Sequence, residues 1–112
     1  MQDMKHPVTK STLSPARARI VTLMQKVGFG TIDGLHVRGG EPSYTPPPRI
    51  VREIKFGGDN GPHAMAKAED FVLKEQVREF LSHLDAIGTG TIQTLEVKHG
   101  LPFRMTIEEV NA

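Results

Sequence analysis

The feature that most constrains this chain is its similarity to itself. When the sequence is shifted by 60 positions, residues 28–42 align with residues 88–102 without a gap. Eight positions are identical, where chance would supply about one. In the first segment these are Gly28, Gly30, Thr31, Ile32, Leu35, Val37, Gly40 and Pro42. We therefore expect one folding unit to occur twice, as repeat 1 over 14–56 and repeat 2 over 69–109, joined by a connector over 57–68.

Each unit is expected to begin with an amphipathic helix. In repeat 1, Ser14 is a good N-cap and Pro15 suits the first helical position. In repeat 2, Glu69 and Asp70 supply the negative charge that a helix N-terminus favours. A glycine, Gly28 or Gly88, is placed to end each helix. The apolar residues recur with helical spacing. They are Ile20, Leu23, Met24 and Val27 in repeat 1, and Val77, Phe80, Leu81, Leu84 and Ile87 in repeat 2.

A β-hairpin is expected after each helix. Apolar residues alternate at Leu35 and Val37 and again at Leu95 and Val97, which is strand spacing. The turns fall on 39–40 and 99–100, where glycine permits positive φ. Ile32 and Ile92 are one position out of phase, so a bulge is expected near Asp33-Gly34 and Gln93-Thr94. Prolines 46–48 cannot lie inside a sheet, which makes residues 49–56 an extra edge strand.

This element order predicts a single α+β domain over 14–112. Its antiparallel sheet carries both helices on one face. The alternative that shares the element order is a circularly permuted ferredoxin-like fold. Residues 1–13 are polar, lack the apolar core of a signal peptide, and are predicted to form a loose tail. The chain has no cysteine and no apolar run of the roughly 20 residues that a membrane span needs. We therefore expect a cytoplasmic protein with no membrane partner.

Charge is distributed unevenly between the halves. Residues 1–56 carry nine Lys and Arg against four Asp and Glu, whereas residues 57–112 carry five against nine. This asymmetry predicts one basic and one acidic face, and such faces complement each other either within the chain or between copies. The basic face is the candidate site for an anion or a nucleic acid. Its residues are Arg38, Arg49, Arg52 and Lys55, with Tyr44 placed to stack on a base.

No catalytic, cofactor-binding or metal-binding motif emerges from the sequence. The five histidines lack ligand spacing, and the glycine clusters lack the Lys-Ser/Thr of a phosphate loop. An enzyme would need a pocket that holds His36, His99 or Asp33, with Glu96 nearby. The sequence therefore favours a non-enzymatic interaction module that binds itself or another protein. Nucleic-acid binding through repeat 1 is the first alternative, and an enzyme with an unrecognised site is the second.

Residues 23–32, Leu-Met-Gln-Lys-Val-Gly-Phe-Gly-Thr-Ile, resemble the YezD-like family of small bacterial proteins of unknown function. That family consists of single helix-hairpin units with an aromatic-Gly-Ser/Thr-Val/Ile step between helix and strand. Residues 29–32 match this step, whereas in repeat 2 Thr89 stands in place of the aromatic residue. The resemblance implies a tandem duplication of the family's unit, in which the two units pair with each other.

Overall fold

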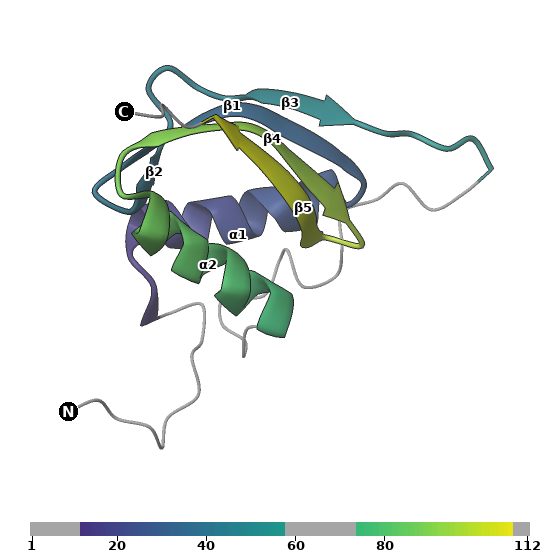
Figure 1. Cartoon of the computed structure of the whole chain (residues 1–112). Helices are drawn as coiled ribbons and strands as arrows, with labels where there is room; N and C mark the ends of the chain where they lie inside the picture. The colour runs from purple at the N-terminus through teal and green to yellow at the C-terminus, as the bar shows by residue number, and fades with distance from the viewer. Residues whose placement is uncertain (1–11, 58–73, 109–112) are drawn as a thin grey trace.

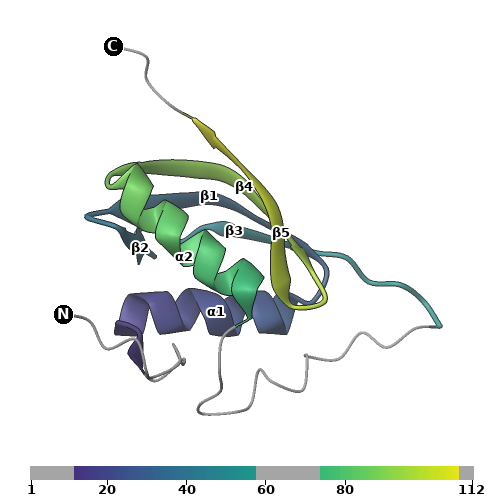
Figure 2. The ribbon, with the colours of Figure 1, turned by 60° about the horizontal axis from the view of Figure 1, so that its bottom comes forward.

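The computed structural model describes residues 12–57 and 74–108. They form α1 (Pro15–Val27), β1 (Gly30–Arg38), β2 (Glu41–Ser43), β3 (Arg49–Arg52), α2 (Glu75–Ile87), β4 (Gly90–Lys98) and β5 (Leu101–Glu108). The expected α+β class is confirmed. Both helices lie on the same side of the sheet in Figures 1 and 2. The tail up to residue 11, the connector over 58–68, and Glu69 and Asp70 lie outside the described residues.

The sheet is antiparallel, with the order β2-β1-β4-β5 and β3 also paired to β1. β2 pairs with the C-terminal part of β1 and β3 with its N-terminal part, so both short strands line one edge. Prolines 46–48 separate them, whereas β5 runs unbroken along β4. The centre thus holds the first strand of each hairpin. The circularly permuted ferredoxin-like alternative is wrong, because that fold would place the second strand of each hairpin there.

The register of β1 with β4 is unchanged when each residue is exchanged for its counterpart 60 positions away. Gly30 lies opposite Val97, and Val37 lies opposite Gly90. Each of these residues has a counterpart 60 positions away, because 90 − 30 and 97 − 37 both equal 60. The two central strands are therefore related by an approximate two-fold axis at the middle of their pairing.

A break in side-chain alternation lies at this axis. Both strands bury their apolar residues with a spacing of three and then two, at Ile32, Leu35 and Val37 and at Ile92, Leu95 and Val97. Each strand therefore carries one residue more than strict alternation requires. In β1 this is Gly34, with φ of +73°. In β4 the register with β5 shifts between Ile92 and Thr94, which confirms the bulge expected there.

Both ends of α1 and the C-terminal end of α2 follow the sequence signals, whereas α2 begins at Glu75, after Lys74, which makes no side-chain cap hydrogen bond. The Ser14 side chain accepts a hydrogen bond from the Arg17 backbone N–H at 3.2 Å. Gly28 and Gly88 end the two helices with φ of 72° and 67°. One hydrophobic core unites the helices with the inner face of β1 and β4. Its buried members are Ile20, Val21, Met24, Val27, Ile32, Leu35, Val37, Val77, Phe80, Leu81, Leu84, Ile92, Leu95 and Val97.

Candidate interaction surface

Strand β3 forms an exposed edge of the sheet. It pairs with β1 through Arg52 opposite Gly30, Val51 opposite Thr31, Ile50 opposite Ile32 and Arg49 opposite Asp33. In the part of the chain that the structure describes, β3 pairs with no other strand. In Figure 1, residues 53–57, which follow β3, extend away from the sheet. β3 is therefore an outer strand of the sheet among the described residues.

The close approach of β3 to β1 depends on Gly30. A Cβ atom at this position would lie 2.0 Å from the Val51 carbonyl oxygen, and Gly30 has φ of +151°. The Glu53 backbone N–H also donates to the Phe29 carbonyl oxygen at 2.8 Å, which extends the contact by one residue. Gly30, which has the counterpart Gly90 in the second unit, thus allows β3 to pair closely with β1.

Apolar side chains gather along this edge. We call Ile50, Val51, Ile54 and Phe56 the apolar edge. Their exposed fractions are 42%, 40%, 55% and 95%. Ile50 lies opposite the buried Ile32 and therefore points to the helix side of the sheet, while Val51 points to the opposite side. The expected edge strand over 49–56 is thus confirmed as a strand over Arg49–Arg52, and its apolar residues are more exposed than their alternation suggested.

The structure separates the predicted basic site into two parts. Arg49 and Arg52 begin and end β3, and Lys55 follows three residues later; all three are exposed. Arg38 is exposed at the far end of β1, beyond the segment that pairs with β3. Arg49 faces Asp33 across the strands, so an acidic residue interrupts the basic row.

Tyr44, the aromatic member of the predicted site, has other contacts. Its hydroxyl donates to the Ala16 carbonyl oxygen at 2.7 Å, and the Arg19 guanidinium lies 4.1 Å from its ring centroid. Burial raises the pKa of the Tyr44 hydroxyl; Arg19 opposes this rise and Glu41 adds to it. Arg19 therefore already covers one face of the ring that was expected to stack on a base. No sequence pattern indicates this contact, since the two residues are far apart along the chain.

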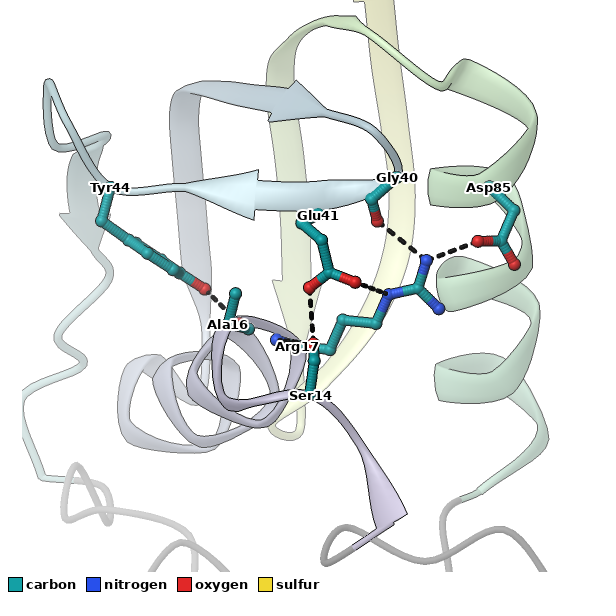
Figure 3. A network of polar contacts seen from close by, with 7 residues as sticks. All are labelled: Ser14, Ala16, Arg17, Gly40, Glu41, Tyr44 and Asp85. Carbon is teal, nitrogen blue, oxygen red and sulfur yellow. Dashed lines mark hydrogen bonds and ion pairs between the residues drawn. The ribbon is translucent and has the colours of Figure 1, made fainter.

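A polar network joins α1, the turn after β1 and α2 (Figure 3). The Arg17 guanidinium donates to the Gly40 carbonyl oxygen at 2.8 Å and to the Asp85 carboxylate. Its Nε lies 3.4 Å from Glu41, which also accepts a hydrogen bond from the Ser14 hydroxyl. The Arg17 side chain is 17% exposed. Because every charge in this network has a partner, we interpret it as a structural clamp between the helices.

Two cavities flank the helices. One, of about 370 Å³, lies between α2 and β5 and is lined by residues that include Phe80, His83 and Met105. The other, of about 490 Å³, is lined by residues of α1 and the β2–β3 segment. Two of its lining residues, Arg19 and Lys26, are basic and none is acidic. The second cavity was not anticipated, because the sequence does not show which residues of α1 face the proline segment.

The residues required by the enzyme alternative do not all converge. His36 lies opposite Thr91 and contacts its hydroxyl at 3.1 Å. His99 instead packs edge-on against Phe29, just before the other end of β1. Gly30 and His36 are six positions apart in β1, which corresponds to about 20 Å of strand. His36 and His99 therefore lie near opposite ends of β1.

Within residues 12–57 and 74–108, no group of three or more His, Cys, Asp or Glu side chains is arranged to hold a metal ion. No helix formed by those residues has the length and hydropathy needed to cross a bilayer.

Comparison of the chain with known proteins finds no relative. No protein-family model matches the chain, and neither the curated proteins nor the solved structures contain a significant match to it.

Proposed function

We propose that this protein is a non-enzymatic interaction module that binds an extended segment along β3. The carrying observation is the apolar edge, with four apolar side chains that are 40% to 95% exposed. It lies on and just beyond a strand whose outer side meets no other described strand. Strand addition at such an edge combines main-chain hydrogen bonds with contacts to alternate side chains.

The opposite edge of the sheet supports this choice by contrast. Its exposed aromatic residue, Phe103 on β5, has Lys98 at 4.0 Å and Arg104 at 5.2 Å from its ring centroid. These two cations cover part of the Phe103 ring. The apolar edge instead presents Phe56 almost fully exposed. We therefore assign binding to β3 and not to β5.

The proposal includes the duplication. Two copies of one helix-hairpin unit, as in the YezD-like resemblance, would pair through β1 and β4 and leave one outer strand on each side. The two-fold register of β1 and β4 supports this origin. In repeat 1 the prolines divide the outer strand and restrict its exposed part to a short segment. A short edge favours a defined partner over open-ended stacking of strands.

Selection of peptides on the full chain tests this function. We expect a library of random decapeptides, selected on the wild-type protein, to yield β-forming sequences. In fluorescence polarisation these peptides should bind Arg52→Pro at least about tenfold more weakly, because that proline removes a backbone donor of the edge. Phe103→Ala, which removes an exposed aromatic residue from the other edge, is the matched control and should bind normally. Equal binding to Arg52→Pro would overturn the proposal.

A second candidate function is binding of a phosphate-bearing ligand in the cavity beside α1. Arg19 and Lys26 line it without an acidic residue, and Tyr44 provides a polar ring. Paired cations of this kind suit a phosphate group. Titration with inorganic phosphate at low salt, followed by NMR, should shift the backbone signals of α1. The shifts should disappear in the Arg19→Glu, Lys26→Glu variant and persist in Arg38→Glu, and a wild-type spectrum that does not change would exclude this candidate.

A further inference from the structure

We infer that the segment added to β3 is β3 of a second copy, in one specific antiparallel register. This inference rests on the proposed strand addition and names its partner. In this register Val51 lies opposite Val51 of the second copy, and Arg49 lies opposite Glu53 of the second copy. Chain symmetry produces that charge pair twice.

The direction of the backbone groups shows which residues of β3 turn away from β1. In an antiparallel strand, the N–H and C=O of one residue point to the same side, and successive residues alternate. The Glu53 N–H binds Phe29, and the Val51 carbonyl oxygen lies against Gly30, so odd-numbered residues point toward β1. The backbone groups of Ile50 and Arg52 therefore point outward. Val51 would occupy a non-hydrogen-bonded position, where opposing Cα atoms are only about 4.5 Å apart.

Two-fold symmetry limits the registers. Residues directly opposite each other must lie on the same face of the joined sheet, so the axis must pass through a residue of β3 or its extension. An axis at Arg52 would set two arginines against each other and Arg49 against Lys55. An axis at Glu53 would oppose two glutamates. Like charges directly opposite each other destabilise a sheet.

An axis at Ile50 would oppose Arg49 to Val51 and form no charge pair, whereas the axis at Val51 is free of these repulsions and pairs opposite charges. It places the apolar Val51 side chains in contact and forms two Arg49–Glu53 pairs between copies. The hydrogen-bonded positions are then Ile50 opposite Arg52, again twice. Pro48 ends the pairing on either side, because it has no backbone donor. The result is one sheet that continues from one copy into the other, with the helices of both copies on the same side.

The interface is short, so the dimer should be weak. Interfaces of low buried area are typical of transient complexes, and we expect a dissociation constant of about 10–500 μM. Sedimentation equilibrium over that range of concentration should detect the dimer. The association should weaken with added salt because both charge pairs are exposed.

Single cysteines test the register, since the chain has no cysteine of its own. Val51→Cys should form a disulfide-linked dimer under mild oxidation, because opposing Cα atoms fall within disulfide range. The matched control is Arg49→Cys on the same strand. Its sulfur would lie about four residues from its own copy across the pair, so it should remain mostly monomeric. Equal crosslinking of the two variants, or none with Val51→Cys, would overturn the register.

Charge reversal provides an independent measurement. Arg49→Glu or Glu53→Arg alone turns both attractive pairs into repulsive ones, and each should weaken the dimer about tenfold or more. The double variant restores opposite charges and should recover most of the affinity. Failure of the double variant to recover, with circular dichroism showing folded protein, would contradict the inference. If dimerisation fails while selected peptides still bind in an Arg52-dependent way, strand addition stands and only its partner is wrong.

Discussion

Two corners of the molecule share a backbone bond but differ in the side chains around it. At each corner a hairpin turn meets the end of the helix from the other half. The Gly40 N–H donates to the Gly88 carbonyl oxygen at 2.8 Å, and the Gly100 N–H donates to the Gly28 carbonyl oxygen at 2.9 Å. These four glycines are two pairs of counterparts 60 positions apart (100 − 40 and 88 − 28).

The first corner is polar and the second is largely apolar. Arg17, Glu41 and Asp85 surround the first in an ion network. Their counterparts 60 positions away lie at the second corner. Val77 corresponds to Arg17, Leu101 to Glu41 and Gln25 to Asp85. Val77 and Gln25 are buried and Leu101 packs against the core, while the Gln25 side-chain oxygen has no hydrogen-bond partner among residues 12–57 and 74–108.

The comparison separates what the backbone determines from what the side chains add. The glycine bond recurs whether the surroundings are charged or apolar, so it defines the corner. The ion network adds a link from α1 to α2 that the apolar corner lacks. A partly buried ion pair contributes little net stability compared with a well-packed apolar group, but it favours one geometry.

The largest expected effect comes from the shared centre of the two halves. Ile32 and Ile92 are counterparts with no exposed surface. Ile32→Ala and Ile92→Ala should each lower the free energy of unfolding by about 2–5 kcal/mol, because each leaves a cavity in the same core. Urea denaturation measures both values. A difference above about 1.5 kcal/mol would show that the halves do not pack equivalently.

A smaller effect should distinguish Gly30 from its counterpart Gly90. Gly30→Ala places a Cβ atom against the Val51 carbonyl oxygen and should cost about 2–4 kcal/mol or detach β3. Gly90→Ala meets only a side-chain carbon of Ile87 at 3.2 Å and should cost about 1 kcal/mol or less. Thermal denaturation compares their stability, and hydrogen exchange at residues 50–53 reports detachment. Normal protection in Gly30→Ala would contradict the assigned role of this glycine.

The sequence predicted much of this scaffold because its signals are local. Ser14, Pro15 and the terminal glycines define helix ends through neighbouring backbone groups, and alternation identified the strands. Strand order could not be predicted, since it depends on how distant hairpins meet. The exposure of the apolar edge and the Arg19–Tyr44 contact were missed for the same reason. Burial and pairing across long sequence separations leave no local pattern.

Tyr44 is half-buried, whereas its counterpart 60 positions later, Arg104, is exposed. Tyr44→Phe should cost about 1 kcal/mol through the lost bond to Ala16. The raised pKa of Tyr44 in the folded protein also makes stability depend on pH. Stability is fully present below the ordinary tyrosine pKa of about 10 and declines as pH rises above it, because the unfolded chain ionises first. Tyr44 is the chain's single tyrosine. The midpoint of the tyrosinate absorbance titration should therefore fall at a higher pH in the folded protein than in urea. Identical midpoints would contradict the prediction.

The smallest effect is expected from making the two corners alike. The triple variant Arg17→Val, Glu41→Leu, Asp85→Gln gives the first corner the residues of the second. Its free energy of unfolding should change by less than about 1.5 kcal/mol in either direction, because apolar packing replaces the ion network. Arg17→Val alone leaves Glu41 and Asp85 without their cation and should be less stable than the triple variant. The reverse order in chemical denaturation would show that the network stabilises the fold.

The paired extra residues of β1 and β4 restrict how the chain can change in length. Gly34 and Gln93 lie between the paired residues Asp33–Thr94 and Leu35–Ile92, so the strands keep a common register only while both carry the addition. Losing one of them would shift half of the central pair by one position and turn its core side chains toward water. Loss of both would restore the match. Deletions here should therefore be tolerated in pairs, which makes the centre of the sheet a place where two distant codons must change together.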